Sequence, residues 1–485
     1  MKLEIHPGAR QTLADRLFEA GVEFPCGGES ACGGCRVRVL EGEVPVTAAM
    51  RDALGEMEVR DGWRLACCAE AAGRVVVEVE QWSLYVLTDE SRVPIEPRAG
   101  RGAAIDLGTT TLVVQVVDLA SGEVVGVQTA LNPQARYGAD VMSRLQYDLG
   151  RPGELGRLIH RALARMLEGM LGGEPLREVL VAGNTAMHHL FCGLDVEPLT
   201  HAPFVSPTMG ACRFADGELG WPGPAEFLPC LGGFVGSDLL CGIVATGLDE
   251  QTRPRALFDI GTNGEVVVGS AQGIECASTA AGPAFEGGRV GAGMRAGTGA
   301  IDSVHVRDGG LACHVLGGGR ARGVCGSGLV DAAACGLSLG LIRANGRLAS
   351  ADKRLPLADG VALAQSDIRE LQLAKGAMAA GLRMLAGGGS GRTGVDRLCL
   401  AGAFGNYIRQ ASARAIGLLP DDLPVEPVGN SALRGARMLL LAPATRQARL
   451  RKIAALSRHV ELASDPDFQD LFAEGMAFAR YRLRG

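Results

Sequence analysis

Residues 103–115 read AAIDLGTTTLVVQ, and residues 256–268 read ALFDIGTNGEVVV. Each stretch joins an apolar run, which predicts a buried strand, to an Asp, a Gly-Thr turn and a second apolar run. The same order of residues thus occurs twice, about 150 positions apart, and such a repeat indicates two structurally related halves. We expect a body of two lobes, each opening with a strand, a tight turn and a second strand.

Each copy of this repeat places an acid at the end of a strand and Gly and hydroxyl residues in the turn. A carboxylate in this position can order Mg²⁺, while turn N–H groups and hydroxyls donate to phosphate oxygens. We assign Asp106 and Asp259 to Mg²⁺ or to the attacking water. Either copy alone is a weak signal, because an ordinary β-hairpin has the same pattern. The expected phosphate contacts lie in the two turns: Gly108, Thr109, Thr110, Gly261, Thr262 and Asn263.

A third element near residue 400 completes the pattern. Residues 397–408, RLCLAGAFGNYI, predict a strand that runs into a glycine turn, where a nucleoside can lie against the backbone. The adenosine contacts are expected at Gly402, Ala403 and Gly405. In this order the motifs resemble the phosphate-1, phosphate-2 and adenosine motifs of the actin, sugar kinase and Hsp70 superfamily, over residues 101 to about 440. The resemblance implies two ribonuclease-H-like lobes with ATP and Mg²⁺ in the cleft between them.

Three cysteines lie in a glycine-rich loop near the N-terminus, PCGGESACGGC. Cys26, Cys32 and Cys35 are separated by five and two residues, and a fourth thiol is available at Cys67 or Cys68. Three thiolates from one loop and a fourth from a distant segment are typical of a [2Fe–2S] cluster. A zinc knuckle also uses a C-x-x-C pair, but zinc sites usually draw on two such pairs. The cysteine spacing therefore favours the cluster.

Residues 1–82 resemble a plant-type or adrenodoxin-type [2Fe–2S] ferredoxin domain, an α+β fold of the β-grasp class. The five-residue spacing of the first two cysteines matches the adrenodoxin type. In similar domains the fourth ligand follows Arg-Leu-Ala, which selects Cys67 and leaves Cys68 as the alternative. Residue periodicity predicts the surrounding elements: a strand at 2–6, a helix over 12–22, and strands at 35–44 and 74–80.

The composition is that of a globular protein, with 47% hydrophobic and 21% charged residues among 485. A net charge of −6 gives no reason to expect nucleic acid as a partner. No apolar run reaches the roughly 18 residues that span a bilayer, and the N-terminus lacks the order of a signal peptide. We therefore expect a cytoplasmic protein without disulfides. Ten scattered cysteines are interpreted as small apolar residues: Cys68, Cys192, Cys212, Cys230, Cys241, Cys276, Cys313, Cys325, Cys335 and Cys399.

Several further segments, together with the two parts above, point to a narrower group. With them the chain resembles the reductive activators of corrinoid proteins, which depend on ATP. The resemblance implies reduction of inactive cob(II)amide to cob(I)amide in a corrinoid protein of a methyltransferase system. One electron would pass through the cluster, from a donor such as ferredoxin, flavodoxin or a chemical reductant in vitro. The segments are NPQARYGADVMSRL (132–145), VAGNTAMHHL (181–190), GGFVGSDLL (232–240), GPAFEGGRVGAGMRAGTGAI (282–301) and GVCGSGLVDAAA (323–334).

An energetic argument explains why a ferredoxin would be joined to an ATPase. A plant-type cluster has a potential near −400 mV, and electron transfer from it to cob(II)amide is expected to be uphill. Each 100 mV uphill costs about 2.3 kcal/mol for one electron. A conformational cycle that binds a partner differently in two nucleotide states can supply a few kcal/mol.

The motifs also set the expected domain plan. Larger members of the group place a linker and a small middle domain between the ferredoxin and the ATPase. Here about 33 residues separate Cys67 from Gly102, too few for a further domain, so we expect none. The tail from residue 462 is expected to form one amphipathic closing helix. The plan has a ferredoxin domain (1–82), a linker (83–100), a first ATPase lobe (101–255), a second lobe (256–440) and a C-terminal helical segment (441–485).

Three other features contain residues that could take part in binding or catalysis, but the sequence does not assign them a single role. Asn184 follows a predicted strand, and it either points into the cleft or only caps the next helix. The adjacent His188 and His189 are interpreted as core residues, because neighbours in a helix point in different directions. The glycine-rich segment 282–301, which includes Arg289 and Arg295, is interpreted as a partner-facing or phosphate-sensing loop.

Three rival functions stay open from sequence. The first is a small-molecule kinase of the same superfamily with a regulatory ferredoxin domain, which would phosphorylate an added substrate. The second is an activator of a radical dehydratase, which would hold a [4Fe–4S] cluster between two subunits. The third is an electron-transfer adaptor that does not hydrolyse ATP. A homodimer is also left open.

Overall fold

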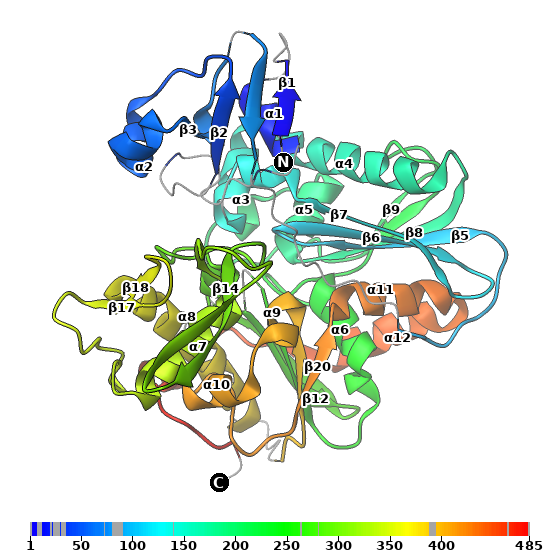
Figure 1. The fold of residues 1–485 in the computed structure, drawn as a ribbon. Helices are drawn as coiled ribbons and strands as arrows, with labels where there is room; N and C mark the ends of the chain where they lie inside the picture. The colour runs from blue at the N-terminus through cyan, green and yellow to red at the C-terminus, as the bar shows by residue number, and fades with distance from the viewer. Residues whose placement is uncertain are drawn as a thin grey trace.

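The computed structural model shows three main sheets that follow one another along the chain, a small N-terminal sheet and two larger ones, and the described residues also form two minor sheets of three and two strands (Figure 1). Among the described residues, no helix is both long enough and apolar enough to span a membrane. The structure describes residues 2–6, 12–19, 22, 30, 35–71, 73–79, 91–138, 140–261, 264–279, 281–387, 394–462 and 465–483.

The N-terminal domain is an antiparallel sheet in the order β1-β4-β2-β3 with helix α1 packed against it. Alternation of side chains builds its core, since Val75 and Val77 are buried whereas Val76 and Glu78 are partly exposed. The predicted strands and helix of this domain are confirmed. Its elements are β1 (Lys2–Ile5), α1 (Leu13–Glu19), β2 (Arg36–Glu41), α2 (Ala48–Arg60), β3 (Trp63–Leu65) and β4 (Val75–Glu78).

The first lobe has a six-stranded sheet in the order β7-β6-β5-β8-β10-β9. The strands β5, β6 and β7 are antiparallel, and β8 and β10 continue the sheet in parallel with β5. Helices α4 and α5 cover one face with an apolar cluster. The elements are β5 (Arg101–Leu107), β6 (Thr111–Asp118), β7 (Val124–Leu131), α3 (Val141–Gly150), α4 (Glu154–Leu171), β8 (Leu176–Gly183), α5 (Thr185–Cys192), β9 (Cys212–Phe214) and β10 (Ala225–Phe227).

The second lobe repeats this plan in its sheet, ordered β20-β19-β11-β12-β13-β21. Here β11, β12 and β13 are antiparallel, and β19 and β20 continue the sheet in parallel with β11. The two-lobed fold predicted from the sequence repeat is thereby confirmed. The main elements are β11 (Arg255–Ile260), β12 (Gly264–Ser270), β13 (Gly273–Thr279), β14 (Ala300–Arg307), β15 (Gly310–Val315), α7 (Gly326–Ser338), α8 (Gln365–Gly387), β19 (Leu398–Ala401), α9 (Gly402–Tyr407), α10 (Gln410–Ala415) and β20 (Val425–Gly429).

Two helices lie between the large sheets and join them (Figure 1). They are α6 (Ser237–Thr246) and α11 (Ser431–Leu441). Their apolar cluster includes Ala104 from β5 and Leu257 from β11, both fully buried. The lobes therefore share one core, although α6 and α11 lie almost 200 residues apart in the sequence.

The chain between the small domain and the first lobe is docked from residue 91 onward. Val93 and Ile95 pack against the shared core. The backbone N–H of Glu96 donates to Leu441 O (2.8 Å), and the guanidinium of Arg98 forms an ion pair with Glu178. The second half of the expected linker is thus a fixed strap across α11.

The C-terminal segment departs from the expected helical one. Only part of it is helical, in α12 (Pro443–Leu456) and α13 (Pro466–Gly475). Between them, β21 (Ser457–His459) pairs in parallel with β13. The segment therefore completes the sheet of the second lobe, and the closing helix is shorter than expected because it ends at Gly475.

Candidate active site

The two acid-turn motifs face each other across a cavity of about 530 Å³. Asp106 lies near the end of β5 and Asp259 near the end of β11, and both strands are central in their sheets. The carboxyl ends of central strands are where open sheets with parallel strands bind ligands. The cavity is lined by residues of both lobes, so the sequence repeat builds a single site.

Four of the acidic side chains that line this cavity have a raised pKa. Burial raises the pKa of Asp106 to about 6, partly offset by a hydrogen bond from Asn430. Burial, followed by the charge of Asp106, raises the pKa of Asp259 to about 7. Burial and then Asp259 raise that of Asp238 to about 7, and burial raises that of Glu265. Such a cluster of hard oxygen donors fits Mg²⁺, whose charge would offset their repulsion.

The first turn is braced from three directions. The side-chain amide of Asn132 donates to Gly108 O (2.8 Å), and its backbone N–H donates to Thr110 O (2.9 Å). The buried guanidinium of Arg144 donates to Thr109 O, and Asn184 Nδ2 donates to Thr109 Oγ1 (2.8 Å). The turn is therefore held in place before any ligand binds.

Asn184 fulfils both roles considered from sequence. Its Oδ1 accepts from Met187 N (3.0 Å), which caps α5, while its Nδ2 holds the first turn and the residue lines the cavity.

The third motif lies beside the second turn. Gly402 has φ +85°, and a Cβ there would lie 2.8 Å from Ile260 O and 3.2 Å from Asp259 Oδ1. Only glycine fits this close approach. Gly405, in α9, instead packs against Leu400 of the preceding strand β19, and its neighbours Phe404 and Tyr407 line the cavity.

Three of the predicted nucleotide-binding residues are described by the structure in part or not at all. Gly261 lines the cavity, whereas Thr262 and Asn263 lie outside the described residues. Ala403 belongs to α9, but its side chain is not among those described.

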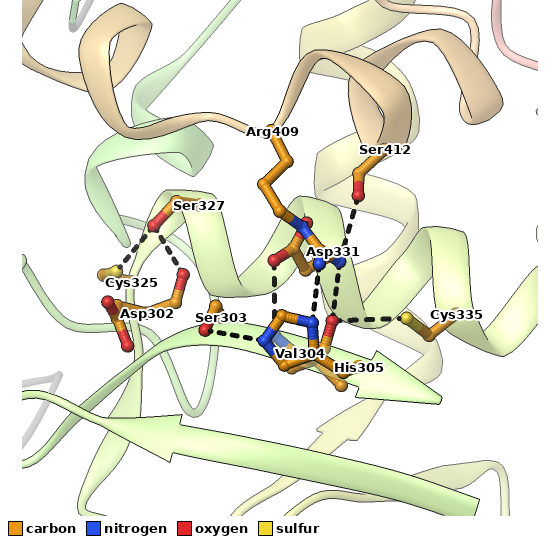
Figure 2. Close-up of polar contacts among 10 residues, drawn as sticks. All are labelled: Asp302, Ser303, Val304, His305, Cys325, Ser327, Asp331, Cys335, Arg409 and Ser412. Carbon is orange, nitrogen blue, oxygen red and sulfur yellow. Dashed lines mark hydrogen bonds and ion pairs between the residues drawn. The ribbon is translucent and has the colours of Figure 1, made fainter. Parts of the chain in front are cut away.

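One wall of the cavity was missed from sequence (Figure 2). Asp302 of β14 and Ser327 of α7 line it, and Ser327 Oγ donates to Asp302 O (2.8 Å). Behind them, Arg409 Nε donates to the buried Asp331 (2.9 Å), and a second nitrogen of Arg409 donates to Val304 O (2.8 Å). This ion pair ties β14 and α7 to the helix that follows the third motif.

Asp238 and Asn430 were also not predicted as site residues, although the local sequence around Asp238 indicates a site acid. It follows the glycine turn GGFVG at the start of α6, a pattern like that of the assigned acids. Asn430 caps α11 and its Nδ2 donates to Asp106 Oδ2 (2.8 Å), a contact across 324 positions that no local pattern indicates.

The segment 282–301 reaches the cavity through two charged residues. Glu286 and Arg295 line it, and Thr110 Oγ1 of the first turn donates to Glu286 (3.4 Å). Arg289 is not among the lining residues. The contact between Thr110 and Glu286 joins the two lobes at the first turn.

Two of the four predicted cluster ligands lie together in the small domain. Cys35 Sγ and Cys67 Sγ are 3.3 Å apart, and Cys67 N lies 3.5 Å from Cys35 Sγ. Cys68 Sγ points elsewhere, toward Leu65 O (3.8 Å). Cys26 and Cys32 lie outside the described residues. Adjacent thiols with a backbone N–H at the sulfur suit an iron–sulfur cluster, which takes thiolate ligands and N–H···S contacts.

The small domain docks on the first lobe close to the first turn. Arg136 forms an ion pair with Asp15 of α1 and lies over the ring of Phe18 (5.7 Å to the centroid). Ala135 and Leu131 pack against the core of the small domain. These residues directly surround Asn132, which holds the first turn.

Comparison with known proteins assigns the three parts in order. A model of the 2Fe–2S iron–sulfur cluster binding domain matches residues 2–72. A model of the RACo middle region matches residues 101–251, and a model of the C-terminal ASKHA domain of RACo matches residues 254–484. The corrinoid activation enzyme RamQ of Eubacterium limosum is 32% identical over 439 residues, which cover 81% of this chain and 72% of RamQ. This chain belongs to the RACo family.

Other RACo-like proteins agree with this assignment. A [Co(II) methylated amine-specific corrinoid protein] reductase of Methanosarcina barkeri is 26% identical over 415 residues, which cover 76% of each chain. The solved structure of a reductive activator for a corrinoid, iron–sulfur protein has a TM-score of 0.68 and 25% identity, and the match covers 98% of both chains. The match to the RACo middle region begins directly after the strap and covers the part of the chain that was expected as the first ATPase lobe.

Proposed function

We propose that this protein is an ATP-dependent reductive activator, which returns the cob(II)amide of a partner corrinoid protein to cob(I)amide with one electron. The single observation that carries the proposal is the joining of a ferredoxin domain to a two-lobed nucleotide cleft in one RACo-family chain. The names of two relatives, a corrinoid activation enzyme and a corrinoid protein reductase, support the same substrate class.

Cys26, Cys32, Cys35 and Cys67 would hold the [2Fe–2S] cluster. When bound, the cluster supplies a one-electron carrier of low potential. Around it, the hydroxyl of Ser30 lies 3.4 Å from Cys67 Sγ and the backbone N–H of Cys67 approaches Cys35 Sγ. Hydrogen bonds to ligand sulfur raise the potential, so these groups would adjust the driving force. The donor would be a reduced ferredoxin, a flavodoxin or a chemical reductant.

The assignment of the fourth ligand is tested by an adjacent pair of variants. We expect Cys67→Ala to lose the cluster, because its thiol adjoins Cys35, and Cys68→Ala to keep it, because its thiol is directed at Leu65 O. Iron and sulfide content and the EPR spectrum of the reduced protein give the result. A full cluster in Cys67→Ala would reverse the assignment.

The carboxylates of Asp106, Asp238 and Asp259 would hold Mg²⁺, directly or through water. When bound, Mg²⁺ supplies positive charge that neutralises phosphate oxygens. The turn at Gly108 would donate backbone N–H groups to the phosphates, and the glycine approach at Gly402 leaves room for the nucleoside. Hydrolysis would use one of the two turn acids to orient water, as sequence suggested for Asp106 and Asp259.

Residues 132–136 supply a physical path between nucleotide and ferredoxin. Asn132 is hydrogen-bonded to the first turn, while Ala135 and Arg136 contact the ferredoxin domain. A turn that moves when phosphate binds would move this segment, and the docking of the ferredoxin domain would change with it. Two nucleotide states would then bind the ferredoxin domain differently, as an energetic coupling requires. Because the reaction uses ATP and reduced thiols, the proposal places the protein in the cytoplasm.

The decisive experiment follows cob(II)amide reduction by absorbance, with the full-length protein, a chemical reductant and a candidate corrinoid protein. We expect cob(I)amide to form only when both Mg²⁺ and ATP are present. It should not form when a non-hydrolysable analogue of ATP replaces ATP. Equal reduction in the absence of ATP would refute the coupling. Phosphorylation of an added small molecule would favour the kinase alternative instead.

A further inference from the structure

A group of soft ligand atoms lies in the first lobe, apart from the cleft and the cluster domain. His188, Cys192 and Cys212 each offer one donor atom, and these atoms all lie within 4.8 Å of one another. His188 and Cys192 belong to α5, and Cys212 begins the edge strand β9. The His188 ring is fully buried, and the two thiols are partly buried. None of the three lines the nucleotide cavity.

The spacing of these atoms matches a tetrahedral metal site. Zinc binds Cys sulfur at about 2.3 Å and His nitrogen at about 2.0–2.1 Å, so tetrahedral angles place sulfur and nitrogen about 3.6 Å apart. His188 Nε2 and Cys212 Sγ are 3.6 Å apart. Two thiols and one imidazole are ligands for zinc rather than for Mg²⁺ or Ca²⁺, which prefer oxygen.

The imidazole is held in the orientation that a ligand needs. The His188 ring stands edge-on to Phe227 (5.0 Å between centroids), and its Nδ1 lies 3.5 Å from His189 Nδ1. Its Nε2 faces the thiols and lies 3.0 Å from Gly210 O. In the metal-free protein the Nε2–H can donate to this carbonyl, whereas metal binding at Nε2 would require the tautomer that carries its proton on Nδ1. These contacts hold the ring with Nε2 toward Cys212.

We propose that His188, Cys192 and Cys212 bind a zinc ion as a Cys₂His site, with solvent in the fourth position. The site would join β9, which pairs only with β10 among the described strands, to helix α5. Asn184 at the start of α5 holds Thr109 of the first turn. The metal would therefore stabilise the helix that braces the phosphate turn, and two of the scattered cysteines would be ligands rather than small apolar residues.

The test uses tag-free, full-length protein purified under anaerobic conditions, so that zinc and cluster iron are counted in the same sample. We expect about one zinc per chain, and zinc-edge X-ray absorption with two sulfur neighbours near 2.3 Å and nitrogen or oxygen near 2.0 Å. In Cys212→Ser we expect at least a tenfold loss of zinc affinity with iron content unchanged. The matched control is Cys313→Ser, which alters a partly buried cysteine of the second lobe and should keep both metals.

Stability gives a second readout that does not depend on activity. A zinc chelator should lower the melting temperature of the wild-type protein and of Cys313→Ser but leave that of Cys212→Ser unchanged. Protein that takes up no zinc from zinc-supplemented buffer would overturn the proposal. So would zinc without sulfur neighbours, zinc kept by Cys212→Ser, or a Cys192–Cys212 disulfide found by mass spectrometry in the anaerobic protein. Unchanged iron content shows that the ferredoxin domain of the variant is intact, and a cooperative unfolding transition at the melting temperature of the chelated wild-type protein shows that its first lobe is folded.

Discussion

The two acid-turn motifs have nearly the same sequence but different surroundings. Asp106 accepts a hydrogen bond from Asn430 and its pKa is raised only to about 6, whereas burial and the charge of Asp106 raise the pKa of Asp259 to about 7. The first acid is oriented by a protein donor, and the second faces like charges. We infer that Asp259 depends more on a bound cation, whereas Asp106 is positioned by the protein itself.

The first turn also has connections that lead out of the cleft. Asn132, Arg144 and Asn184 hold it, and the segment that follows Asn132 contacts the ferredoxin domain. The difference teaches that a sequence repeat can supply two halves of one site, while the path described here from a turn to the ferredoxin domain starts from the first half. The following predictions test this division, from the largest expected effect to the smallest.

The largest effect is expected from Asp259→Asn. Removing the negative charge weakens the cation site and its stabilisation of transferring phosphate, so ATP hydrolysis should fall by roughly 100-fold or more. Phosphate release by the full-length protein measures it. Asp352→Asn, an exposed residue, is the control and should hydrolyse ATP normally. If Asp259→Asn retains normal turnover, the second acid has no role in hydrolysis.

A smaller effect is expected from Asn430→Ser. Serine preserves the helix cap but is too short to reach Asp106, so only the hydrogen bond across the cleft is lost. A hydrogen bond to a charged group contributes about 1.5–3 kcal/mol, so Mg²⁺·ATP affinity should fall about tenfold. Titration calorimetry gives the value, and Asn345→Ser on the surface serves as the control. Unchanged affinity would mean that Asp106 is not oriented by Asn430.

Arg136→Ala tests whether the first turn alone is linked to the ferredoxin domain. We expect ATP hydrolysis to stay within about twofold, while ATP stimulation of cob(II)amide reduction falls about fivefold, the lower range of measured couplings. Arg51→Ala, on the exposed surface of the ferredoxin domain, is the control. Charge exchange in Asp15→Arg with Arg136→Asp should restore part of the loss. An equal loss of hydrolysis and reduction would place Arg136 in the cleft chemistry instead.

The smallest effect concerns pH. Because burial raises the pKa of the turn acids from 3.8 to about 6 and about 7, they bind a cation only after losing a proton. Mg²⁺·ATP affinity should rise about threefold from pH 6 to pH 8, and Asp259→Asn should flatten the rise. The same groups contribute stability to the free protein that is present near pH 4 and is lost as pH rises through about 7, because the folded state holds the protons more tightly. Nucleotide titrations and thermal unfolding across this range measure both slopes.

The sequence predicted those parts of the fold that have a local pattern. The two strand-acid-turn stretches, the strands of the small domain and the helix at Leu13–Glu19 all follow from residue periodicity and turn chemistry. The three-residue strand β21 was not predicted, because so short an element after a helix shows no periodicity in the sequence. Asn430 was not predicted as a site residue, because its contact with Asp106 is formed only when α11 folds across the first lobe.

The same limit applies to the other residues that were missed. Asp302 and Ser327 meet through packing of β14 against α7, and neither belongs to a motif of fixed spacing. Cys192 and Cys212 lie 20 positions apart, a spacing that does not resemble the short metal-binding pairs readable from sequence.

The strap across α11 limits how far the electron-carrying domain can travel. Glu96 and Arg98 fix the chain to the body, and eleven residues separate Val79 of the small domain from Ser91. Fully stretched, a chain of that length reaches roughly 40 Å. In the proposed reaction, the cluster would therefore meet the partner's cobalt within a distance of the body that this chain length sets.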